Sequence, residues 1–200
     1  MFKKIFLVLM ISALILSISG CTDEVVEETP ANTDDLTDAT DTAVVADTIS
    51  ADSQVQDLLP VENIPEGYEF LGSRDLAIEK IEKEYVSVNG TVAGVEGLYM
   101  YQDSTDVYID VIELDSQLSA EEFITEYKAG FNELRSGDDR FKDVTINGHS
   151  AVQILEYLTI DINNVKRYTY IWNNGKFVFV VGGATDDSTV LSEIAEATGY

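Results

Sequence analysis

The sequence predicts an α+β domain built on one antiparallel sheet. Short runs of alternating β-branched and aromatic residues recur between residues 67 and 183. Two stretches with apolar residues at helical spacing interrupt and follow these runs. We expect six to seven strands, with two main helices packed on one face of the sheet, because antiparallel sheets commonly cover one face and leave the other to water or a partner.

The expected strands are separated by polar turn sequences. They are 67–72, 97–102, 106–114, 141–146, 149–158, 165–172 and 176–183. Asn147-Gly148 between the fourth and fifth strands is a strong signal for a two-residue hairpin turn, because both positions tolerate positive φ. The order of elements predicts a strand meander, a helix, a second meander and a last helix.

The clearest helix signal begins at Ser119. Ser119 and Glu122 have the spacing of a capping box, in which the serine accepts from a free backbone amide and the glutamate reaches back. Apolar residues follow at helical spacing, and Gly137 is a typical helix end. These features predict a helix over 119–136.

Two weaker patterns predict further helices. Asp186-Asp187-Ser188 begins a run of helical spacing that reaches Thr198, and acidic residues at a helix start favour the helix dipole. Residues 74–85 are compatible with a short helix.

The first 21 residues carry an export signal. Lys3 and Lys4 precede an uncharged apolar run over 5–18, which is shorter than the ~20 residues of a membrane span. Ile18-Ser19-Gly20-Cys21 resembles the lipobox of bacterial and archaeal lipoproteins. The resemblance implies removal of 1–20 and a lipid on Cys21, which would place the protein on the extracytoplasmic face of the cell membrane. A plain signal peptide and an uncleaved anchor are the alternatives.

An acidic stretch follows the cysteine. From Cys21 to Pro60 there are eleven Asp and Glu residues and no Lys or Arg. Such a segment buries too little apolar surface to fold, and its like charges extend it. We therefore expect a disordered stalk over 21–58 and a single globular domain over 59–200.

The overall charge limits the classes of partner. The chain has a formal net charge of −25, and this balance argues against nucleic-acid binding, which uses clustered basic residues. Cys21 is the only cysteine, so disulfides and zinc thiolate sites are not expected. No cofactor motif is present, and we expect neither a cofactor nor a resident metal.

Several residues could form a site, but each has a structural explanation. Tyr168, Tyr170 and Trp172 alternate and would share one sheet face, as a surface for a glycan or an extended peptide or as core packing. Asp103, Asp106 and Asp110 could offer oxygens to calcium, or serve turns. Asn89-Gly90-Thr91 is a glycosylation sequon and also a good turn.

Catalytic chemistry has little support in the sequence. His149 is the only histidine, and its neighbour Ser150 cannot supply a catalytic triad by adjacency. A pair of carboxylates acting on a glycoside depends on separation in space, which the sequence does not give. We therefore expect no catalytic residues.

The C-terminal half resembles a family. A strand ending at Trp172, an apolar strand over 178–183, an acidic-capped helix ending IAEATGY and the NGHSA turn at 147–151 accompany the lipobox and the Asp/Thr stalk. Together they resemble uncharacterised archaeal, methanogen-type surface lipoproteins with a C-terminal α+β domain. The resemblance implies no activity or site residues. We expect a non-enzymatic binding or envelope-associated domain, whose partner is an envelope protein or a glycan. A module for a small ligand or a cation, or a carboxylate-based hydrolase, is the alternative.

Overall fold

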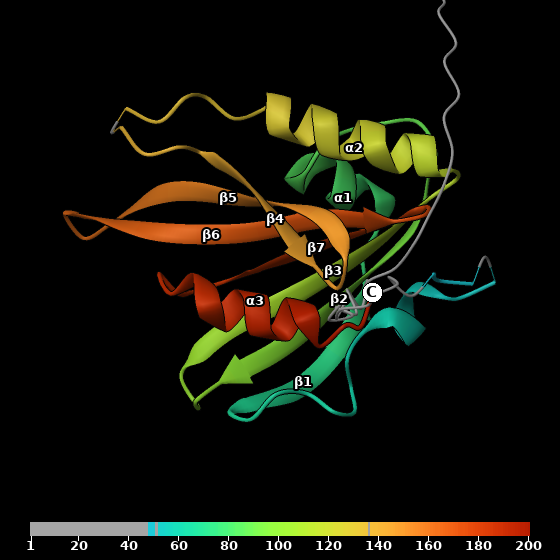
Figure 1. The fold of residues 1–200 in the computed structure, drawn as a ribbon, viewed down its shortest axis with the longest axis horizontal. Coiled ribbons are helices and arrows are strands. Elements are labelled where there is room, and N and C mark those ends of the chain that lie inside the picture. Colours follow the sequence, from blue (N-terminus) through green and yellow to red (C-terminus); the bar gives the residue numbers. More distant parts are fainter. Residues whose placement is uncertain (1–47, 51, 136) are drawn as a thin grey trace, which may run out of the picture. The chain divides into compact units, whose positions relative to one another are not determined.

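The computed structural model describes residues 48–50, 52–135 and 137–200. The export signal, Cys21 and most of the expected stalk lie outside these residues. The described part contains one seven-stranded antiparallel sheet in the order β1-β2-β3-β7-β6-β5-β4 (Figure 1). Its strands are β1 (Tyr68–Asp75), β2 (Thr91–Tyr101), β3 (Thr105–Leu114), β4 (Phe141–Ile146), β5 (His149–Ile160), β6 (Asn163–Asn174) and β7 (Phe177–Gly183). The α+β class and the antiparallel sheet are confirmed.

The sheet joins two meanders. β1 to β3 form the first, β4 to β7 form the second, and β3 pairs with β7 between them. Asn147 and Gly148 both have positive φ and form the expected hairpin turn between β4 and β5. Three α-helices, α1 (Ile78–Glu84), α2 (Gln117–Ala129) and α3 (Ser188–Glu196), accompany the strands.

The two main helices lie on opposite faces of the sheet, so the expectation that both cover one face is corrected. α3 buries Leu191 and Ile194 in the same cluster as Trp172 of β6. α2 buries Phe123 in a second cluster with Ile171, the neighbour of Trp172 on the other face. The sequence of β7 explains this arrangement, because Phe-Val-Phe-Val-Val is buried throughout and such a run needs cover on both sides.

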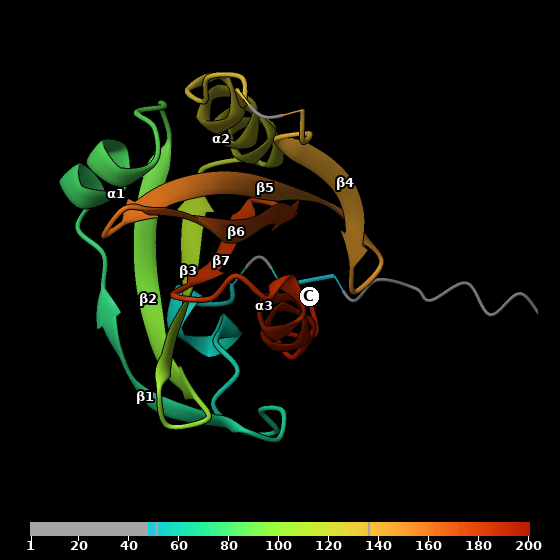
Figure 2. The ribbon, with the colours of Figure 1, turned by 90° about the vertical axis from the view of Figure 1, so that its left-hand side faces the viewer.

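The sheet bends around α3. In Figure 2 the strands curve about α3, while α1 and α2 lie on the outer side of the curve. On the inner side, the rings of Trp172 and Phe179 are cross-strand partners that stack with centroids 5.0 Å apart. The Trp172 indole N–H donates to the backbone oxygen of Tyr200 at 3.0 Å.

α2 is shorter than the sequence predicts and begins earlier. Ser116, not Ser119, is the N-cap, and its hydroxyl accepts from the Ser119 amide at 3.2 Å. The helix ends at Gly130, seven residues before the expected stop. Phe131 leaves the helical path and packs edge-on between Tyr127 and Phe141, with centroid distances of 5.0 and 6.0 Å. Tertiary packing of this ring therefore overrides the helical spacing of the sequence.

The folded part begins before residue 59. A short 3₁₀ helix, η1 (Val55–Leu58), buries Val55 and Leu58 in the cluster under α3. The domain boundary expected at residue 59 is therefore too late, since two core residues precede it.

Candidate functional site

The candidate site is built around Asp110, a carboxyl group buried in the middle of β3. Asp110 is 2 % exposed and lies among Ile109, Val111 and Ile112, which are fully buried. The hydroxyl of Tyr85, the residue that follows α1, donates to Asp110 Oδ2. The other oxygen, Oδ1, is buried and has no hydrogen-bond partner among the described residues.

A second acidic side chain lies directly across the sheet. Glu96 of β2 is the register partner of Asp110, so both carboxyl groups are on the same face. Glu96 is 8 % exposed and pairs with Arg74 of β1, and Lys80 of α1 lies 3.8 Å from it. Two cations therefore neutralise Glu96, whereas Asp110 forms no ion pair in the described part of the chain.

Three tyrosines complete the surroundings. Tyr85 and Tyr127 of α2 lie with ring centroids 5.4 Å apart and planes 71° apart. Tyr108 precedes Asp110 by two residues on the same face of β3 and crosses Gly182 of β7, where a Cβ atom would overlap its hydroxyl. Glycine at 182 thus makes room for the Tyr108 ring.

These side chains line a cleft of about 310 Å³ between α1, α2 and the strands β1 to β3. Burial is the main cause that raises the pKa of Asp110 from 3.8 to about 7, and the Tyr85 hydrogen bond only partly opposes it. Burial also raises the pKa of Tyr85, of Tyr108 and, to about 12, of Tyr127, so these phenols stay protonated at neutral pH.

The cleft can therefore offer one acceptor that gains or loses a proton near neutrality, with neutral aromatic walls. No group of three His, Cys, Asp or Glu side chains that could hold a metal ion is found in residues 48–50, 52–135 and 137–200. The arrangement gathers a buried carboxyl group and three tyrosine side chains around one cleft.

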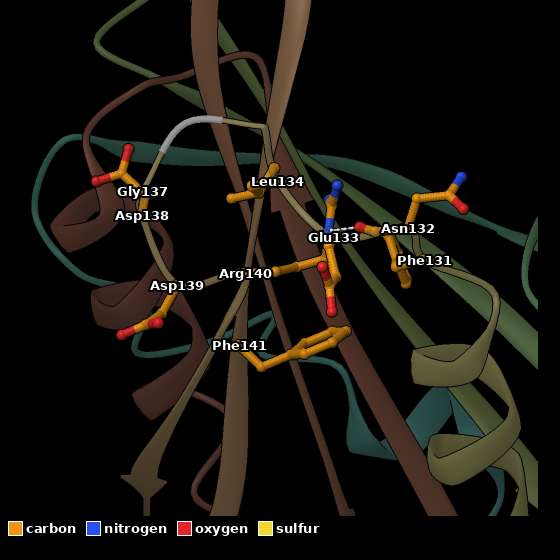
Figure 3. Close-up of a pocket in the computed structure, with 9 residues that line it drawn as sticks. All are labelled: Phe131, Asn132, Glu133, Leu134, Gly137, Asp138, Asp139, Arg140 and Phe141. Atoms are coloured by element: carbon orange, nitrogen blue, oxygen red, sulfur yellow. Dashed lines mark hydrogen bonds between the residues drawn. The ribbon is translucent and has the colours of Figure 1, made fainter.

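A larger hollow lies beside the loop between α2 and β4 (Figure 3). Arg140 lies in its middle and donates to the carbonyl oxygens of Asn132 at 2.6 Å and Leu155 at 2.9 Å. The same guanidinium lies 5.3 Å from the centroid of the Phe131 ring. These contacts already use the guanidinium of Arg140 to hold the loop in place.

The aromatic stripe of β6 does not form an open surface. Trp172 is fully buried, Tyr170 is 5 % exposed and Tyr168 is half-buried against the same cluster. The Tyr170 hydroxyl donates to the Ser188 carbonyl oxygen at 3.2 Å, and α3 covers the stripe. Of the two alternatives for the stripe, core packing is the one that the structure shows, because α3 occupies the face that a glycan or peptide would need.

The three aspartates expected near one turn do not converge. Asp103 lies in the turn with φ of 57°, Asp106 is exposed near the start of β3, and Asp110 is buried further along the strand. The Nε2 atom of His149 lies 3.2 Å from the side-chain amide nitrogen of Asn174. Asn89 is exposed in the turn before β2, where a glycan would have access, while Cys21 lies outside the described residues.

Sequence reasoning missed the grouping of Asp110, Glu96 and Tyr85. One signal was present: Asp110 interrupts the apolar run Val-Tyr-Ile-Asp-Val-Ile on a strand that is buried on both faces. Glu96 and Tyr85 carry no comparable local signal, because their proximity depends on the β2–β3 register and on the path of α1.

No family model matches the chain, and no curated protein or solved structure shows significant similarity to it. Within its described residues the protein has no helix long and apolar enough to cross a membrane.

Proposed function

We propose that this protein is a lipid-anchored, extracytoplasmic domain with a non-enzymatic binding role at the cell surface. The observation that carries the proposal is the lipobox-like Ile18-Ser19-Gly20-Cys21 behind a basic, apolar leader. The acidic stretch that follows supports it, because a chain from Cys21 to Val55 can reach about 110 Å when fully extended. An archaeal envelope protein or glycan within this distance is the expected partner.

The geometry around Asp110 favours binding over hydrolysis. A glycoside hydrolase places two carboxyl groups on either side of the bond that it cleaves. Here both carboxyl groups project from one sheet face, and Glu96 is held by Arg74 and Lys80. Glu96 is therefore engaged in ion pairs, and the two carboxyl groups do not approach a bond from opposite sides.

Cys21→Ser tests the anchor. We expect the wild-type protein to sediment with membranes and to enter the detergent phase, with Cys21 as a lipid-modified first residue by mass spectrometry. The serine variant should lose the lipid and its two-chain anchor, which is the stable form of attachment. Ser19→Ala is the matched control, since it keeps a small residue two positions before the cysteine and should leave processing intact.

Two results would contradict the proposal. One is a wild-type protein whose mature N-terminus is not a lipid-modified Cys21. The other is a serine variant that still partitions as fully into detergent as the wild type, which would indicate an uncleaved apolar anchor.

A further inference from the structure

We propose that the cleft between α1, α2 and strands β1 to β3 binds a small organic ammonium group, with Asp110 as its counter-ion and tyrosine rings as its walls. The inference rests on the proposed binding role and names the chemical class of its ligand. The cleft lies on the opposite face of the sheet from the aromatic stripe of β6.

A free acceptor in the cleft is the first argument. Asp110 is 98 % buried, one carboxyl oxygen accepts from Tyr85, and the other is buried without a partner among the described residues. A buried acceptor left unpaired destabilises the folded state, and does so more when it is charged. An N–H donor entering the cleft would satisfy it.

The distribution of charge indicates that this donor is cationic. Arg74 and Lys80 both engage Glu96, and Lys80 also lies 3.6 Å from Glu84. The cations of the cleft thus form their ion pairs with glutamates, and Asp110 has no ion pair of its own among the described residues. A positively charged group would supply both the missing hydrogen bond and the missing charge.

The walls favour an organic cation over a metal ion. Tyr85 and Tyr127 both line the cleft, and their rings meet edge to face with centroids 5.4 Å apart. Ring faces attract ammonium groups but are poor metal ligands. The cleft of about 310 Å³ is at the small end of ligand sites and suits a compact group.

The site should respond to pH near neutrality. The pKa of Asp110 is raised to about 7, chiefly by burial, and an ammonium group needs the ionised form. Charged and titratable groups face this carboxyl from every neighbouring element: Arg74, Lys80, Glu84, Tyr85, Glu96, Tyr108 and Tyr127. Burial raises the pKa of Tyr85, Tyr108 and Tyr127, so these phenols stay protonated and Asp110 controls the response. The apparent affinity should fall about tenfold between pH 8 and pH 6.

Calorimetric titration of the full-length protein in detergent with methylammonium tests the proposal. We expect binding at pH 8 that exceeds the response to potassium at equal ionic strength, because potassium reports only the diffuse attraction of the acidic surface. Asp110→Asn should lower the affinity at least tenfold. Asp106→Asn is the matched control, since it makes the same change at an exposed position of the same strand and should bind as the wild type does.

The binding results test the ammonium site independently of the proposed lipid anchor. Equal affinity of the wild type and Asp110→Asn would overturn it, as would methylammonium that binds no more tightly than potassium. If Asp110→Asn fails to fold, the wild-type pH profile decides, and a flat profile from pH 6 to pH 8 overturns the site. None of these results depends on whether Cys21 carries a lipid.

Discussion

At the scale of single residues, Asp110 couples the stability of the fold to pH. Its pKa is about 7 in the folded protein and near 3.8 when exposed, so the folded state keeps a proton that the unfolded state loses. Its contribution to stability is complete below pH 4 and is lost as the pH rises towards 7. The free energy of unfolding should fall by about 1.4 kcal/mol per pH unit across this window.

Asp110→Asn should remove this dependence. The amide is neutral at every pH, so the variant should be more stable than the wild type at pH 8, by a few kcal/mol, and its stability should change less between pH 4 and pH 7. Urea unfolding followed by circular dichroism at several pH values measures both effects.

Asp106→Asn again provides the comparison for this change. Asp106 is exposed, so its amide variant should follow the pH profile of the wild type. An Asp110→Asn profile that runs parallel to the wild type would show that Asp110 titrates as an ordinary carboxyl group.

The sequence predicts the roles of some residues but not of others. The chemistry of Asn147-Gly148 specifies its turn because the required backbone angles are local. Trp172 could have faced a ligand or the core, and only the position of α3 decides between them. The neighbours of Asp110 come from four separate elements, so no local pattern could place them together.

At the scale of elements, the pairing of β3 with β7 requires glycine at position 182, opposite Tyr108. Tyr108 and Gly182 are register partners, and the phenol occupies the space that a Cβ atom at 182 would need. Gly182→Ala should destabilise the protein by about 1–3 kcal/mol through overpacking. Chemical denaturation measures the loss, and combination with Tyr108→Phe should recover part of it because the overlapping hydroxyl is removed.

Gly137→Ala is the control for the glycine substitution. A Cβ atom there would meet no other atom within 4 Å, so the change should be close to neutral. A Gly182→Ala protein as stable as Gly137→Ala would contradict the proposed packing of Tyr108 over β7.

The elements themselves were largely predictable, and their ends were not. All seven strands follow from β-branched and aromatic runs between turns, since both signals are local. The start of α2 differs because Ser116 and Ser119 are both suitable caps, and the end differs because Phe131 packs on Phe141.

At the scale of the whole molecule, the fold depends on residues that composition assigns to the stalk. Val55 and Leu58 are 3 % and 2 % exposed beneath the sheet, although acidic residues surround them in sequence. Replacing both with serine in the full-length chain should lower the free energy of unfolding by about 3–5 kcal/mol. Thermal unfolding of the two proteins checks this value.

The neighbouring pair Gln56 and Asp57 supplies the matched control. Both are exposed, so Gln56→Ser with Asp57→Ser should change stability little. Equal stability of the two double variants would show that the fold does not need η1. Net charge and composition could not locate this boundary, because burial of two residues in an acidic segment is a property of the assembled core.

Because helices pack on both faces of the sheet, the fluorescence of the tryptophan should report on one face only. The single tryptophan, Trp172, is fully buried on the α3 face, whereas the Asp110 cleft opens on the face of α1 and α2. Its emission should be blue-shifted and insensitive to aqueous quenchers while the protein is folded. Occupation of the cleft should leave this fluorescence almost unchanged, and loss of α3 from the sheet should shift it to the red. Trp172 is therefore a built-in reporter that records unfolding separately from binding.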